Sequence, residues 1–278
     1  MKILFDIGHP AHVHLFKNAR RILADRGHSV FMLARDKEVT HQLLKSYKID
    51  YIRGTEQKKG LINRFIELFK WFFLCLKIIK KNQIDIVASI GSPAAAWAAK
   101  ISGIKHLTFN DTEISWEQRL LYSTGSFLIF TPYCLVAEYG YKQVRYKGIH
   151  DLAYLSPKYF NPDKKIKGKL GFSQNDKYAL VRFVSWDASH DWGKTKTLKS
   201  AKIDIVEKLL TEFKVVISAE GNLPEELEKY RLSISPGKFH DVIASASVVV
   251  SDGATTATEA AVLGRPSLYI SGLFKYLG

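Results

Sequence analysis

Short apolar, β-branched runs alternate with longer segments of helical period along the first 130 residues. The runs that predict strands cover residues 2–7, 29–34, 51–52, 85–90, 105–109 and 127–130. The segments that predict helices include 11–26, a stretch ending near Tyr47, 61–81 and 93–101. Alternation of this kind predicts a parallel sheet with right-handed crossovers. The N-terminal half is therefore expected to be Rossmann-like.

The alternation stops and then resumes in the second half of the chain. Residues 131–169 are dominated by Tyr, Lys, Gly and Pro, which predicts an interdomain connection. Further strands are expected at 178–184, 214–218, near 232–235, 248–250 and 267–270, with a helix over 254–263. A chain of 278 residues is long enough for two domains. We predict an α/β protein with an N-terminal domain at 1–150 and a C-terminal domain at 151–278, both Rossmann-like.

A phosphate-binding turn is predicted between the strand at 248–250 and the helix that follows it. The turn at Gly253 would present unpaired backbone N–H groups and a helix dipole to an anion. The hydroxyls of Thr255 and Thr256 could add donors, and Glu259, one turn later, could accept from a pair of sugar hydroxyls. The alternative is an ordinary βαβ unit in which Thr255 only caps the helix.

The string D-G-x-T-x-x-x-E-A-A-x-L-G-x-P in this segment resembles the nucleotide-diphosphate motif of GT-B glycosyltransferases and UDP-GlcNAc 2-epimerase. The resemblance implies that Gly253 and the threonines meet a diphosphate and that Glu259 holds the ribose. It also implies a GT-B-like fold, in which two Rossmann-like domains face each other across a cleft. GT-B proteins carry further helices after this motif, so we expect the C-terminal domain to be incomplete.

Three histidines lie in the loop D-I-G-H-P-A-H-V-H at residues 6–14. They could bind a metal, be solvated at a helix start, or belong to a functional loop in which Gly8 lets substrate approach the backbone. No arrangement of Cys, Asp or Glu completes a zinc pattern, so we expect no metal site. The loop resembles the opening of a family of GT-B-like proteins of unknown function, along essentially the whole chain. His12 best matches a histidine in the glycine-rich turn of the peptidoglycan UDP-GlcNAc transferase.

Carboxylates follow the predicted strand at 105–109. Asp111 or Glu113 could act as a general base, or Asp111 or Thr112 could cap the helix that contains Trp116. An unperturbed histidine has a pKa near 6.5, suited to proton transfer around neutrality. We therefore expect His12 rather than either carboxylate to be the base.

The C-terminal domain has further candidates at its predicted strand ends. Arg182 could bond two diphosphate oxygens with its planar guanidinium. Glu220 lies in a loop that resembles a cleft loop of the GT-B proteins. That resemblance also places Phe239 or His240 beside the nucleotide base. Each of these residues could instead have a purely structural role.

The net charge of +14 calls for an anionic partner. The basic residues are dispersed and no nucleic-acid-binding motif is found, so we expect no nucleic-acid partner. Phosphorylated substrates and anionic lipid both fit the charge. The predicted helix at 61–81 has too many charges to span a bilayer. It could be buried against the sheet, or it could lie on a membrane surface with its apolar face.

The absence of other motifs narrows the function. No Asp-x-Asp triplet occurs, and no G-x-G-x-x-G follows a strand, so we expect no nicotinamide or other cofactor. We predict a metal-independent glycosyltransferase that moves a sugar from a nucleoside-diphosphate sugar, such as a UDP-sugar, to a surface-polysaccharide or lipid-linked acceptor. The alternatives are a sugar-nucleotide epimerase or hydrolase and a non-catalytic nucleotide-sugar-binding protein. Two isolated cysteines suggest the cytoplasm, with peripheral binding at the inner membrane face as a further expectation.

Overall fold

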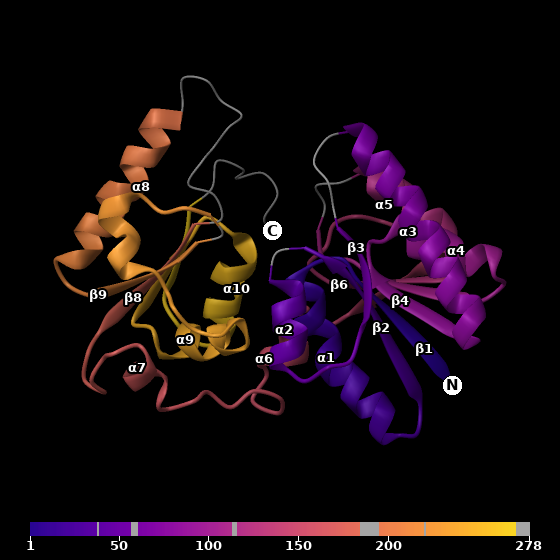
Figure 1. Ribbon diagram of the computed structural model, residues 1–278, viewed down its shortest axis with the longest axis horizontal. Coiled ribbons are helices and arrows are strands. Elements are labelled where there is room, and N and C mark those ends of the chain that lie inside the picture. Colours follow the sequence, from indigo (N-terminus) through magenta and orange to yellow (C-terminus); the bar gives the residue numbers. More distant parts are fainter. Residues whose placement is uncertain (38, 57–60, 113–115, 184–194, 220, 271–278) are drawn as a thin grey trace. The chain divides into compact units, whose positions relative to one another are not determined.

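The computed structural model describes residues 1–37, 39–56, 61–112, 116–183, 195–219 and 221–270. The chain divides into two compact units, unit 1 at Met1–Tyr154 and unit 2 at Leu155–Phe274. Each unit is built of parallel strands and helices (Figure 1). The units are described separately.

Unit 1 contains a seven-stranded parallel sheet in the order β3-β2-β1-β4-β5-β6-β7. Its strands are β1 (Lys2–Ile7), β2 (Ser29–Asp36), β3 (Ile52–Glu56), β4 (Ile86–Ile90), β5 (Lys105–Phe109), β6 (Leu128–Pro132) and β7 (Gln143–Tyr146). Its helices are α1 (Pro10–Asp25), α2 (Thr40–Ser46), α3 (Leu61–Asn82), α4 (Pro93–Ile101), α5 (Trp116–Gly125) and the short α6 (Leu152–Leu155) at the unit boundary; the 3₁₀ turn η1 spans Gly140–Lys142. The strand order reverses between β1 and β4, where ligands bind in open α/β sheets.

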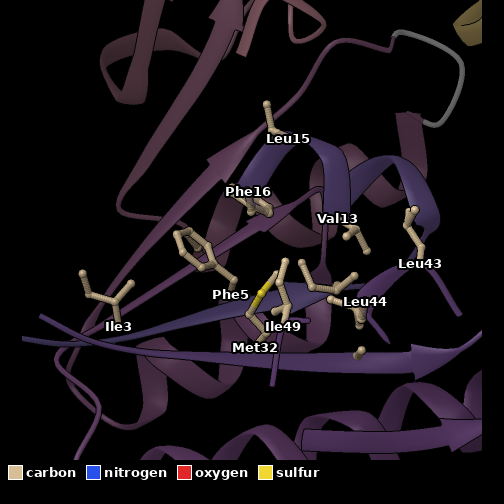
Figure 2. Packing of buried hydrophobic residues seen from close by; sticks show 12 residues of the cluster. Ile3, Phe5, Val13, Leu15, Phe16, Met32, Leu43, Leu44 and Ile49 are labelled. Carbon is tan, nitrogen blue, oxygen red and sulfur yellow. The ribbon is translucent and has the colours of Figure 1, made fainter. Parts of the chain in front are cut away.

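The central strands of unit 1 are buried on both faces, as their continuous apolar runs predict. On one face, Phe5 of β1 stacks on Phe16 of α1, with ring centroids 4.5 Å apart. Figure 2 shows this cluster, in which Val13 and Met32 also lie. On the other face, Trp71 of α3 packs beside alanines of α4. Thus α1 and α2 cover one face, and α3 and α4 cover the other (Figure 1).

Unit 2 contains a four-stranded parallel sheet in the order β11-β10-β8-β9. Its strands are β8 (Tyr178–Phe183), β9 (Lys214–Ala219), β10 (Val248–Ser251) and β11 (Ser267–Tyr269). Its helices are α7 (Ile166–Lys169), α8 (Thr195–Leu210), α9 (Phe239–Ser245) and α10 (Ala254–Val262), with 3₁₀ turns η2 (Glu225–Tyr230) and η3 (Pro236–Lys238). Gly264, with φ +68°, follows α10 in the left-handed conformation that ends many helices.

The predicted α/β class with two Rossmann-like units is confirmed, but two elements differ. The strand expected near 232–235 is wrong, because only an isolated bridge joins Arg231 to Ile217 before a 3₁₀ turn begins at Pro236. The predicted connection at 131–169 contains the seventh strand, β7. Among the described residues, no helix is long and apolar enough to cross a membrane.

Candidate functional site

The turn between β10 and α10 in unit 2 is held by Ser251. Its hydroxyl accepts a hydrogen bond from the Gly253 amide and donates one to the Gly253 carbonyl, both at 3.0 Å. Gly253 occupies the N-cap of α10 and has no side chain to accept from the first amides of the helix. These amides are therefore suited to an anion. Thr255 is exposed in the first turn, whereas Thr256 is buried.

Arg182 at the end of β8 lies beside this turn, because the register pairs it with Ser251 of β10. The Asp252 amide donates to the Arg182 carbonyl at 3.1 Å. The guanidinium donates to the Ser218 hydroxyl at 2.9 Å and lies 5.8 Å from the ring centroid of Phe239. The structure thus brings Arg182, Gly253 and Phe239 to the same edge of the sheet.

Lys202 of α8 is a second cation at the turn, and sequence reasoning missed it. Its ammonium group lies 2.9 Å from the Asp252 carboxylate, and both side chains are mostly buried. Lys202 sits in a lysine-rich segment whose spacing does not distinguish it from its neighbours. Its pairing depends on how α8 packs over the sheet, which the local sequence does not show.

Glu259 and His240 form a buried pair. The Nε2 atom of His240, on α9, lies 2.9 Å from Oε1 of Glu259, on α10. The exposed fractions are 2% for His240 and 4% for Glu259. The carboxylate therefore lies beneath the turn rather than on an open surface, and His240 contacts it directly.

In unit 1, the loop after β1 uses its histidines to hold the start of α1. His9 is the N-cap, and its Nδ1 accepts from the Ala11 amide at 3.2 Å. The Nδ1 of His12 accepts from the Gly8 amide, also at 3.2 Å. His14 is buried and stacks on Tyr154. Among the described residues, no three or more His, Cys, Asp or Glu side chains form a group that could hold a metal ion.

The electrostatic environment of His12 changes the argument for a base. The pKa of His12 is lowered to about 3, chiefly by burial and to a smaller extent by the neighbouring His9, while Asp111 opposes the change. The ring is therefore neutral at pH 7, and its pKa is far from the value that favours general-base catalysis. His12 and Asp111 interact, and the buried imidazole does not have the ordinary pKa near 6.5 on which the expectation of a base rested.

Asp111, after β5, is bound by His150, a residue that the sequence analysis did not identify. Its Oδ2 atom lies 2.8 Å from Nδ1 of His150. Burial raises the pKa of Asp111, but the hydrogen bond and attraction of His150, together with a backbone hydrogen bond and the neighbouring His12, hold that pKa below its ordinary value. His150 is buried, and its Nε2 has no hydrogen-bond partner within the described residues.

Two predicted site residues, Glu113 and Glu220, lie outside the described residues. The remaining candidates form two groups, one in each unit. In unit 1, Gly8 bonds to His12, which interacts with Asp111. In unit 2, the candidates surround the start of α10. Each group lies at the carboxyl ends of parallel strands, where α/β sheets bind ligands.

Two parallel-sheet units, the second with an uncapped helix start next to an arginine, match a fold seen in solved structures. The UDP-GlcNAc 2-epimerase from Neisseria meningitidis, bound to UDP-GlcNAc, aligns with a TM-score of 0.70 and 16% identity over 97% of this chain and 82% of its own. The Methanocaldococcus jannaschii UDP-GlcNAc 2-epimerase, in complex with UDP-GlcNAc and UDP, aligns with a TM-score of 0.71 and 14% identity over 96% of this chain and 83% of its own. MurG from Acinetobacter baumannii aligns with a TM-score of 0.52 and 16% identity over 97% of this chain and 78% of its own.

The fold class is therefore GT-B, as the sequence motif implied. At these identities the likeness shows the fold alone. Residues 1–273 match the family described as "Protein of unknown function (DUF354)", and the chain belongs to that family. Among curated proteins, none matches the chain significantly.

Proposed function

We propose that this protein binds a nucleoside-diphosphate sugar, such as a UDP-sugar, through unit 2 and transfers the sugar to a surface-polysaccharide or lipid-linked acceptor. The observation that carries the proposal is the start of α10, where the N-cap Gly253 has no side chain to offer the first amides of the helix. Arg182 lies beside this turn, Lys202 pairs with Asp252 in it, and Glu259 follows one turn later. A diphosphate matches the amides and cations, because helix starts and guanidinium groups both bind phosphate oxygens. Glu259 would accept from the ribose.

The same groups have a chemical role in the reaction. When the bond between a sugar and a diphosphate breaks, negative charge develops on the leaving diphosphate. Fixed donors aimed at that charge lower the barrier. In unit 1, we retain His12 and Asp111 as the candidate groups for proton transfer, with Glu113 as a further candidate.

A second candidate function is the epimerisation or hydrolysis of a sugar nucleotide. It is favoured by the likeness to UDP-GlcNAc 2-epimerases, whose TM-scores are higher than that of MurG. Stabilisation of a leaving diphosphate serves this chemistry equally, so the geometry of unit 2 does not separate the two.

Product analysis with UDP-GlcNAc separates these functions. Transfer gives free UDP and a glycosylated acceptor, epimerisation gives a changed sugar nucleotide, and hydrolysis gives UDP with free sugar. Binding without reaction would favour a non-catalytic nucleotide-sugar-binding protein. In a thermal-shift assay, ligand at a hundredfold over its dissociation constant should stabilise the protein by about 2.7 kcal/mol. The absence of binding to any nucleoside diphosphate or its sugar would refute the proposal.

We further propose that helix α3 contacts an anionic membrane surface, at the inner face of the membrane. The helix buries Trp71 and Cys75 against the sheet, as expected for a packed helix. Its other side exposes Phe65, Phe69 and Phe73 at 66%, 60% and 62%. Exposed lysines on the same helix (Lys70, Lys77, Lys80 and Lys81) match anionic headgroups.

Co-sedimentation with vesicles tests this contact. The protein should bind vesicles of phosphatidylcholine and phosphatidylglycerol more strongly than phosphatidylcholine alone. Phe69→Ser with Phe73→Ser should reduce binding strongly. Tyr141→Ser is the matched control, because Tyr141 of η1 is an aromatic residue with 93% exposure away from α3. Equal loss in both variants, or no binding by the unchanged protein, would contradict the proposal.

A further inference from the structure

The first two residues of α9 contact different parts of the unit 2 site. Phe239 lies near the Arg182 guanidinium, whereas His240 reaches Glu259 of α10. The His240 ring also meets the edge of Phe160, with centroids 6.1 Å apart and planes at 80°. His240 is thus held between an aromatic neighbour and a carboxylate.

The buried position of Glu259 requires a partner of this kind. A carboxylate removed from water is costly unless hydrogen bonds compensate it. The bond from Nε2 of His240 also restricts the rotation of the carboxylate about its side chain. A carboxylate can accept about four hydrogen bonds, so it can hold His240 and both hydroxyls of a ribose at once.

We propose that His240 is a positioning residue that orients Glu259 toward the 2′- and 3′-hydroxyls of the nucleotide ribose. The site would then select ribonucleoside diphosphates over their deoxy forms. This proposal rests on the proposed function of unit 2, and it replaces the expectation that His240 contacts the base. The competing interpretation is that the pair only fastens α9 to α10, which pack against each other.

Two substitutions of His240 distinguish positioning from a structural role. The amide nitrogen of glutamine reaches about as far as Nε2 of histidine, whereas that of asparagine reaches only about as far as Nδ1. His240→Gln should therefore keep the bond to Glu259, and His240→Asn should lose it. Both variants remove the imidazole ring, so a loss of packing against Phe160 would affect them alike.

Calorimetry with UDP and 2′,3′-dideoxy-UDP provides the measurement. The unchanged protein should prefer UDP by at least roughly tenfold, since hydrogen bonds to a charged group are strong. The preference should persist in His240→Gln and largely disappear in His240→Asn and in Glu259→Gln. A full preference in His240→Asn would overturn the positioning role. Equal loss in His240→Gln and His240→Asn would assign the pair to structure alone.

A measurement on the unchanged protein covers the case in which the variants do not fold. The imidazole resonances of His240, followed by ¹⁵N NMR, should shift on addition of UDP and much less with 2′,3′-dideoxy-UDP. Equal affinity for both nucleotides would overturn ribose selection while leaving diphosphate binding intact. No binding of UDP at all would refute the function proposed for unit 2, and this proposal with it.

Discussion

Gly54 of β3 should tolerate no side chain, because Trp71 of α3 lies directly against it. A Cβ atom at this position would lie 2.2 Å from Cζ3 and 2.4 Å from Cη2 of the indole, and 3.0 Å from the Ala34 carbonyl oxygen. Trp71 is fully buried and donates from its indole nitrogen to the Asp6 carboxyl at 3.0 Å. Gly54→Ala must therefore displace the indole and disturb the hydrogen bond from Trp71 to Asp6 at the end of β1.

The expected cost combines two terms. Overpacking a core costs about 1–3 kcal/mol, and a buried polar group that loses its partner costs about 1–3 kcal/mol more. Gly54→Ala should therefore destabilise unit 1 by roughly 2–6 kcal/mol. At about 2–4 °C per kcal/mol for a domain of this size, the unfolding temperature should fall by roughly 4–24 °C.

Hydrogen exchange of the β1 and β2 amides during urea titration would report unit 1 separately. Gly168→Ala of unit 2, followed through the β8 and β9 amides, is the control, because a Cβ there meets nothing within 4 Å. Phenylalanine lacks the outer edge of the indole, so Gly54→Ala should cost much less in a Trp71→Phe background. A cost within about 0.5 kcal/mol of the control, the usual range for surface substitutions, would refute the reasoning.

Three further predictions concern the candidate site. Arg182→Lys keeps the charge but loses the planar fork, so calorimetry should show UDP binding weakened by roughly tenfold or more and uridine binding unchanged; equal weakening would exclude a role in reading the diphosphate. Burial lowers the pKa of His12 and His106 to about 3, so unfolded chains take up their protons first and stability should fall from pH 6.5 toward 3. Ring resonances of either histidine that titrate above pH 5 in NMR would contradict this. His150→Gln should raise the pKa of Asp111 toward its ordinary value in a ¹³C carboxyl titration, and an unchanged pKa would show that His150 does not hold it down.

The fold was largely predictable because parallel strands buried on both faces leave a strong signal. An apolar run such as that of β1, closed by Gly8 before a helix, identifies a βα unit without knowledge of its neighbours. Strand β7 was missed because its four residues, Gln143–Tyr146, contain no apolar run. It lies at the edge of the sheet, where less burial is required of its side chains.

The candidate site was predictable only where it is local in sequence. Gly253 and Glu259 belong to one turn and one helix, so their spacing indicates their placement. The partner of Glu259 lies 19 residues away and that of Asp252 lies 50 away, on other elements. Periodicity and motif spacing carry no information on such tertiary pairs. The lowered pKa of His12 has the same origin, because burial depends on packing.

The hydrogen bond between the Gly8 amide and His12 affects how substitutions in the loop after β1 should be interpreted. The Gly8 amide already donates its hydrogen bond to Nδ1 of His12. A ligand that accepts from this amide must therefore compete with the imidazole. Binding at Gly8 and release of the Nδ1 lone pair of His12 are then a single exchange. A substitution of His12 would accordingly free the amide as well as remove the ring. Loss of proton transfer and gain of affinity could therefore arise from the same change.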